Sequence, residues 1–181
     1  MKLTKRGEYA LRTLIRLGIA ERRGAEVVSV SSLAESEKLP YKFLENILAE
    51  LRQAGFVESK RGKLGGVMLA RPMNEIKMGE IVRQIDGKLA PIGCASETEY
   101  EKCSCPDEVH CGLRMLMIDV RNAVANILDR YTLEHVVEVT MRKEELDQKS
   151  RAKSKSAKKS ALHADPADGF LAALLTLPPS K

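Results

Sequence analysis

The fold is decided by residues 32–55, which read SLAESEKLPYKFLENILAELRQAG. The first four of these residues form a capping box, in which the serine hydroxyl bonds the amide of Glu35, so a short helix is predicted to follow. Residues 38–39 make the turn, and Pro40 suits the first turn of a second helix because its missing N–H costs nothing there. Two helices joined by a tight turn predict a helix-turn-helix motif.

The flanking segments complete a winged helix. Upstream, apolar residues at helical spacing predict a helix over residues 4–22, with Thr4 as its N-cap. Downstream, residues 56–59 and 67–70 predict two short strands around a basic, glycine-rich tip, which is typical of the wing. The predicted DNA-binding domain therefore covers residues 1–72.

The second half of the chain is predicted to be a connector, a loop and a long helix. Apolar residues between 113 and 131 recur at alternating steps of four and three, a repeat that suits pairing with another helix, and packing onto its own domain is the alternative. The fold class is thus mainly α with a small β-hairpin, a winged helix-turn-helix domain plus a long dimerisation helix. The predicted divisions are 73–111 (connecting helix and cysteine loop), 112–142 (dimerisation helix and a short helix ending near 139) and 143–181 (disordered basic tail).

Charge is divided unevenly along the 181 residues, whose net charge is +5. Residues 1–71 carry 14 Lys and Arg against 8 Asp and Glu, whereas residues 72–146 carry 9 against 14. A basic first domain favours a polyanionic partner such as double-stranded DNA. The absence of a membrane-length apolar run and of a signal peptide predicts a cytoplasmic protein with no membrane partner. No catalytic motif appears, so the chain is not expected to be an enzyme.

Contacts with a DNA operator are expected from the second helix of the motif, from the wing and from the first helix. Recognition helices present polar side chains from their first turn to base edges, and wing cations suit phosphates or the minor groove. For any single residue, a solvated surface charge is the alternative. The predicted DNA-binding residues are Lys5, Arg6, Tyr41, Lys42, Glu45, Lys60, Arg61 and Lys63.

All four cysteines lie within residues 94–111, with the spacings Cys94-x₈-Cys103-x-Cys105-x₅-Cys111. Clustered thiols bind iron–sulfur clusters or zinc, or act as a thiol–disulfide switch. Paired Cys-x₂-Cys knuckles, which zinc sites favour, are absent, and longer loops between thiolates suit a cluster. The spacing is compatible with each of these chemistries, and also with cysteines that have no function.

Four segments together resemble the iron–sulfur winged-helix regulators of the IscR, NsrR and RirA type. The resemblance covers about residues 1–142. The segments are MKLTKRGEYA at the start, LPYKFLENIL in the second helix of the motif, KRGKLGG in the wing, and the cysteines before the long helix. The resemblance implies a homodimer held by the long helix, and a [2Fe-2S] or [4Fe-4S] cluster bound by three cysteines and one other ligand.

The resemblance also implies a ligand set for the cluster. Cys94, Cys105 and Cys111 match the three family cysteines, and Cys103 is an extra thiol that could substitute for Cys105. Some members use an acidic residue near the N-terminus of the partner subunit as the fourth ligand, and Glu8 matches that position here. A first-turn acid favoured by the helix dipole is the alternative for Glu8.

These features predict a regulator of transcription that senses iron, nitric oxide or redox state through an iron–sulfur cluster. We expect it to act as a repressor. A cluster-free regulator that senses oxidants by forming a disulfide is the alternative. A third possibility is an adaptor that uses the winged helix to bind protein rather than DNA.

Overall fold

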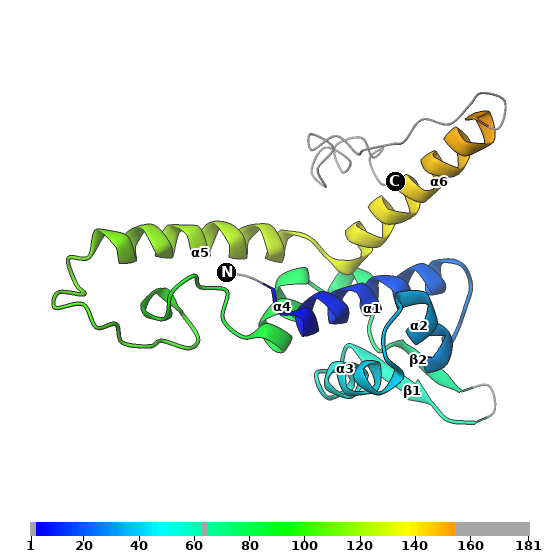
Figure 1. The fold of residues 1–181 in the computed structure, drawn as a ribbon, viewed down its shortest axis with the longest axis horizontal. Coiled ribbons are helices and arrows are strands. Elements are labelled where there is room, and N and C mark those ends of the chain that lie inside the picture. Colours follow the sequence, from blue (N-terminus) through cyan, green and yellow to red (C-terminus); the bar gives the residue numbers. More distant parts are fainter. Residues whose placement is uncertain (1–2, 63–64, 155–181) are drawn as a thin grey trace. The chain divides into compact units, whose positions relative to one another are not determined.

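A computed structural model describes residues 3–62 and 65–154 of the chain. It is mainly helical with a two-stranded antiparallel sheet, which confirms the predicted fold class (Figure 1). The chain divides into two compact units, residues 1–134 and 135–181. Among the described residues, no helix is both long enough and apolar enough to cross a membrane.

The elements follow the predicted order. They are α1 (Lys5–Arg22), α2 (Val30–Glu37), α3 (Tyr41–Gln53), β1 (Val57–Lys60), β2 (Gly66–Leu69), η1 (Met73–Glu75), α4 (Met78–Asp86), η2 (Gly93–Ala95), α5 (Gly112–Arg130) and α6 (Leu133–Ser154).

Side-chain caps set where the first two helices begin. Thr4 caps α1 as predicted, because its hydroxyl accepts a hydrogen bond from the Gly7 amide at 3.0 Å. Helix α2 starts earlier than predicted. Its N-cap is Ser29, which accepts from the Ser32 amide at 3.1 Å, so the prediction of Ser32 as the cap is wrong. Two serines compete for the same role three residues apart, and the earlier one allows another turn of helix.

The turn between α2 and α3 depends on Lys38, which adopts the left-handed conformation with φ of 54°. Pro40 then stands at the N-cap of α3, just before the first turn in which it was predicted. The helix-turn-helix core consists of fully buried apolar side chains. They include Leu14, Leu33, Leu44, Ile47, Leu51 and Phe56.

A buried carboxylate ties the end of α2 to α1. The Glu37 side chain is only 6% exposed and pairs with Arg12 at 2.9 Å and Arg16 at 3.0 Å. The Arg12 guanidinium also donates to the Glu37 carbonyl at 3.1 Å. Charge-assisted hydrogen bonds of this kind are among the stronger polar contacts in proteins, so they hold α2 at a defined position on α1.

The wing is attached to the segment that precedes α2. Strand β1 pairs with β2 in the register Val57↔Leu69 to Lys60↔Gly66. Val67 also exchanges two backbone hydrogen bonds of 2.9 Å with Val28. A Cβ on Gly66 would overlap the Val28 carbonyl, so only glycine allows this approach. The prediction of a hairpin is therefore confirmed, and the hairpin is anchored on its β2 side.

Helix α4 packs against both α1 and α5, and a glycine and an aspartate meet at each contact. The backbone N–H of Thr4 donates to the Asp86 carboxylate at 2.9 Å, and a Cβ on Gly7 would overlap that carboxylate. On the other side, Arg83 pairs with Asp129 of α5, and a Cβ on Gly79 would overlap Asp129. The Arg83 hydrogen bond lowers the pKa of Asp129.

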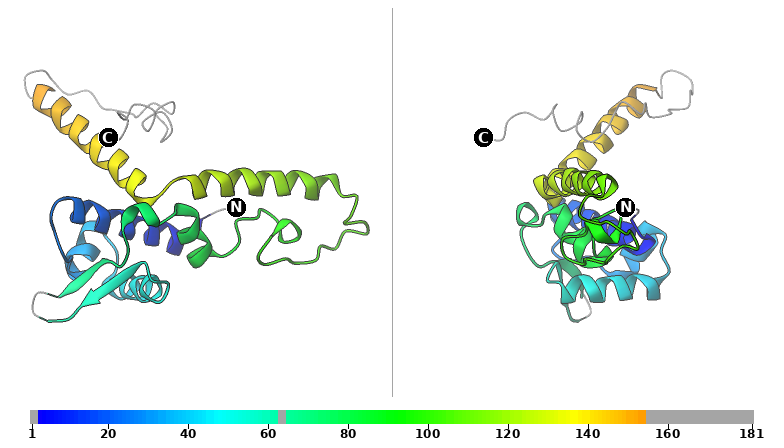
Figure 2. Two further views of the ribbon diagram at one scale, coloured as in Figure 1. Left: turned by 180° about the vertical axis from the view of Figure 1, so that it is seen from behind. Right: turned by 90° about the vertical axis from the view of Figure 1, so that its left-hand side faces the viewer.

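The cysteine loop, residues 88–111, leaves the end of α4, runs out along α5 and returns to its N-terminus (Figures 1 and 2). Gly87, with φ of 79°, ends α4. The 3-10 turn η2 is the part of this loop that contacts α5. The loop and the long helix therefore form one substructure.

Helix α6 is longer than predicted. The expected short helix ending near 139 instead continues to Ser154, so the prediction of disorder is wrong for residues 143–154. This stretch is rich in helix-forming Lys, Glu, Arg and Gln, and Arg151 pairs with Asp147 one turn away at 3.1 Å. The remainder of the predicted tail, residues 155–181, lies outside the described residues.

Replacing Glu37 by alanine should destabilise the first unit, because it removes the buried acceptor shared by two guanidinium groups. We expect a loss of about 2 kcal/mol in the free energy of unfolding, the scale of hydrogen bonds to charged groups. Urea titration followed by circular dichroism measures this. Glu35→Ala, at an exposed position of the same helix, is the control and should change stability far less. Equal stability of the two variants would contradict the role given to Glu37.

Candidate metal centre and nucleic-acid interface

The four cysteines come together in one place. All of them line a cavity of about 290 Å³ between the cysteine loop and the start of α5, which we name the cysteine pocket. Cys94 belongs to η2 and is buried, and Cys111 is the N-cap residue of α5. Cys103 and Cys105 lie on the irregular part of the loop between them. The pocket thus gathers thiols from both ends of the loop.

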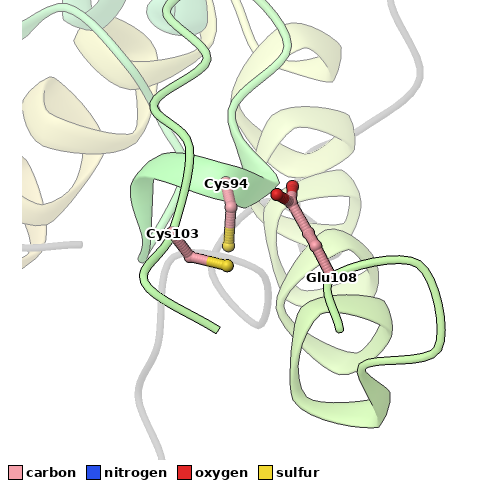
Figure 3. A group of neighbouring side chains, drawn as sticks. All are labelled: Cys94, Cys103 and Glu108. Carbon is pink, nitrogen blue, oxygen red and sulfur yellow. The ribbon is translucent and has the colours of Figure 1, made fainter. Parts of the chain in front are cut away.

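Two of the pocket cysteines lie beside a carboxylate. The ligand atoms of Cys94, Cys103 and Glu108 all lie within 4.8 Å of one another. In Figure 3 the two sulfur atoms point toward each other, and the Glu108 carboxylate lies beside them. Sequence reasoning missed Glu108. Its position could have indicated a ligand, because it is an acidic residue three positions before Cys111 in the loop that carries the cysteines.

Two arginines of α5 hold the backbone of η2 in position. The Arg114 side chain donates to the Cys94 carbonyl at 2.9 Å, and Arg121 donates to the Ala95 carbonyl at 2.8 Å. Arg114 also pairs with Glu108 at 3.3 Å. Since one guanidinium binds both arms of the loop, Arg114 fixes the separation of Cys94 from Glu108.

Crowding and burial disfavour charged thiolates in the pocket. Burial raises the pKa of the Cys94 thiol, and the neighbouring Cys103 raises it further. The pKa of Cys105 is raised to about 11, first by its hydrogen bond with Cys103 and then by the negative charges of the nearby thiols. A positively charged metal centre would relieve this repulsion, because bound thiols are deprotonated.

The donor set suits an iron–sulfur cluster. Thiolates are the usual ligands of such clusters, and here four thiols line one cavity. The Glu108 carboxylate lies within 4.8 Å of the ligand atoms of Cys94 and Cys103. The same donors suit zinc, for which sulfur and carboxylate ligands are also common. The pocket residues therefore fit a thiophilic metal centre.

Glu8, the predicted partner-subunit ligand, lies away from this group in the described chain. It occupies the first turn of α1, where its side chain is 41% exposed and pairs with Lys5 at 2.7 Å and Arg12 at 3.7 Å. The hydrogen bond from Lys5 lowers the pKa of Glu8. His110 is also exposed, and its ring nitrogen contacts Asp107 at 2.8 Å.

The first turn of α3 presents the predicted recognition residues at the surface. Tyr41 is exposed, and the Lys42 side chain is 84% exposed while pairing with Glu45 at 3.1 Å. From α1, Lys5 is exposed, and Arg6 forms an ion pair with Glu50 of α3. The predicted recognition helix therefore offers a cation, a carboxylate and an aromatic ring to solvent on one turn.

The wing places its described cations at the tip of the hairpin. Lys60 ends β1 and lies 3.7 Å from Glu26, and Arg61 follows it at an exposed position. Lys63 lies outside the described residues. The arrangement can contact phosphates on either side of a groove occupied by α3, which is how winged helices combine the two elements.

Comparison with known proteins gives a consistent match over most of the chain. The Rrf2 family, described as iron-dependent transcriptional regulators, matches residues 3–139. The transcriptional regulator NsrR of Bacillus subtilis is 34% identical over 137 residues, which is 76% of this chain and 90% of that protein. The regulator CymR of the same bacterium is 33% identical over 140 residues, covering 77% of this chain and 92% of that one.

The solved structure of CymR, the global cysteine regulator of B. subtilis, has the same fold. It aligns with a TM-score of 0.63 at 30% identity, over 76% of this chain and 97% of that chain. A winged-helix regulator architecture is therefore shared along nearly the whole of the relative.

Proposed function

This chain belongs to the Rrf2 family of transcriptional regulators, and we propose that it is a dimeric repressor that senses iron, nitric oxide or redox state through an iron–sulfur cluster in the cysteine pocket. The members of the family are regulators of transcription and not enzymes. The observation that carries the finer proposal is the convergence of all four cysteines on one cavity. Cysteines with separate structural roles would have no reason to line one cavity together.

The proposed cluster ligands are Cys94, Cys105 and Cys111, with Cys103 as the alternative second thiolate and Glu8 of a partner subunit as the fourth position. When bound, an iron–sulfur cluster supplies iron sites that exchange electrons and react with oxidants and nitric oxide. The cysteine thiols would lose their protons on binding the cluster. Cys94 is buried, so the loop keeps water away from it.

The loop is linked to the DNA-binding helices by polar contacts. Arg114 and Arg121 attach η2 to α5, and Asp86, just before the loop, is held by Thr4 at the start of α1. A change in the loop would therefore act on the long helix and on the first helix of the winged domain. In a dimer, this would alter the spacing of two recognition helices that read half-sites about one DNA turn apart.

The proposed dimer forms through one edge of α5. Among the described residues 112–130, none is fully buried in the single chain. Met115 is exposed on another side of the helix, and the other four exposed large apolar side chains recur at intervals of three, four and seven residues, which places them on one edge. They are Leu113, Leu116, Val120 and Ile127.

A cluster-free thiol–disulfide regulator is the second candidate function. The side chains of Cys94 and Cys103 lie close enough that small adjustments would allow a disulfide, and CymR, described as a cysteine regulator, has the same fold. Iron and sulfide analysis of anaerobically purified protein separates the two candidates, because only the first requires both elements.

Replacing Cys111 by alanine should abolish the visible absorption of the anaerobically reconstituted protein, because a thiolate ligand is lost. At matched salt, the variant should bind operator DNA with an affinity that differs from that of the cluster-bound wild type by roughly 5- to 150-fold, the usual range of coupling between sites. Ser104→Ala, at an exposed position of the same loop, is the control. A complete cluster spectrum in Cys111→Ala, or equal operator affinities, would refute the proposal.

Replacing Ile127 by glutamate should shift the protein from dimer to monomer, because a charge would be buried on the apolar edge of α5. Ile127 is 53% exposed in the single chain, so the change should leave the fold intact. Sedimentation velocity measures the assembly state. Asn126→Glu places the same charge on the polar side of the helix and should remain dimeric. A dimeric Ile127→Glu variant would rule out this edge as the interface.

Replacing Lys42 by alanine should weaken DNA binding about equally across sequences and reduce the slope of log affinity against log salt by about 1, the signature of one lost phosphate contact. Titrations at several salt concentrations measure both. Lys149→Ala removes the same charge from α6 and serves as the control. An unchanged salt slope in Lys42→Ala would show that this side chain does not contact phosphate.

A further inference from the structure

We propose that Glu108 is the oxygen ligand that completes the metal centre from within the same chain. This inference rests on the proposed function, since it names a ligand of the same pocket. It differs from the expectation that Glu8 of a partner subunit fills that position. The geometric basis is the group of Cys94, Cys103 and Glu108, whose ligand atoms lie within 4.8 Å of one another (Figure 3).

Glu108 is unusually enclosed for an acid in this loop. Its side chain is only 18% exposed, whereas Glu101, the acid that lines the cysteine pocket, is 68% exposed and pairs with Lys88. Enclosing a carboxylate costs free energy unless partners are provided. Of the two acids, Glu108 is therefore the one enclosed beside the ligand atoms of Cys94 and Cys103, while Glu101 is exposed and paired with Lys88.

Two side chains hold the Glu108 carboxylate in place. The Tyr100 hydroxyl lies 2.7 and 2.8 Å from its two oxygens, and Arg114 lies 3.3 Å from it. Hydrogen bonds of this kind orient the carboxylate ligands of metal sites. An ionised carboxylate has about four lone-pair positions, so the contacts with Tyr100 and Arg114 leave room for a metal.

Charge balance favours the same assignment. Three cysteine thiolates and one carboxylate place several negative charges in a small volume, and Arg114 is the cation that contacts both Glu108 and the carbonyl of Cys94. Glu8, in contrast, is already paired with Lys5 and Arg12, so it would have to leave both cations to bind a metal. Glu108 also has partners, Tyr100 and Arg114, but these hold its carboxylate beside Cys94 and Cys103, so it can bind a metal from the position that it already occupies.

A carboxylate ligand would also make one bond of the metal centre weaker than the others. Oxygen donors bind iron less tightly than thiolates do in sulfur-rich sites, so the bond to Glu108 would be the one most readily displaced. Tyr100 and Arg114 are then positioning residues, because they act on the metal only through the carboxylate.

The test compares wild type, Glu108→Gln, Glu101→Gln and Glu8→Gln after anaerobic reconstitution with ferrous iron and sulfide. Circular dichroism first establishes that each variant is folded. Iron and sulfide content, the visible absorption spectrum and the rate of iron loss to EDTA are then measured. Glu108→Gln should change the spectrum and lose iron at least about ten-fold faster, the lower range for altered metal sites. Glu101→Gln is the control and should match wild type, and Glu8→Gln tests the competing assignment to the partner subunit.

Glu108→Asp provides a second check, because it retains the carboxylate and should restore the wild-type spectrum. A Glu108→Gln variant with the spectrum and iron-loss rate of wild type would overturn the inference while leaving the proposed function intact. A spectral change in Glu8→Gln alone would overturn it in favour of the partner subunit. Wild-type protein without iron and sulfide would instead refute the proposed function, and the inference with it.

Discussion

Two arginine side chains of α5 hold the backbone of the cysteine loop, and the shape of the pocket depends on them. The carbonyls of Cys94 and Ala95 accept from Arg114 and Arg121. The loop has no regular ladder of hydrogen bonds beyond the single turn η2, so these charged donors replace the pairing that a helix or strand would supply. Because they project from the long helix, the thiols are positioned by the same element that is proposed to join two subunits.

Most of the winged domain could be predicted because its helices and strands each carry a local sequence signal. Apolar spacing and a capping threonine predicted α1, the turn and Pro40 predicted α3, and two short strands around a glycine-rich tip predicted the hairpin. These signals are local, and the buried core that they imply is the one observed. Ser29 and Ser32 can each cap a helix, and the prediction made from the sequence named the wrong one of the two.

The candidate site was less predictable because its contacts are not periodic. Spacing showed that the cysteines were close in sequence, but it could not show that Cys103 lies beside both Cys94 and Cys105, or that Glu108 joins them. Those contacts arise from the path of an irregular loop pinned by Arg114. Helix α6 was underestimated for another reason. Its polar composition was taken as a sign of disorder, whereas a charged sequence of good helix formers can remain helical.

The two glycine–aspartate contacts of α4 have a consequence for how such a protein can change. Gly7 lies against the Asp86 carboxylate and Gly79 against that of Asp129, so a methyl group at either glycine would have to displace the aspartate that joins α4 to its neighbour. Apart from the η2 backbone that Arg114 and Arg121 hold, the length of the loop between α4 and α5 is less restricted, since doubling a loop costs only about 0.6 kcal/mol of closure entropy. The loop between these two helix contacts is therefore a segment that can be exchanged for another. Loops of other lengths and with other donor atoms could be inserted there, and the frame that reads DNA would keep its dimensions.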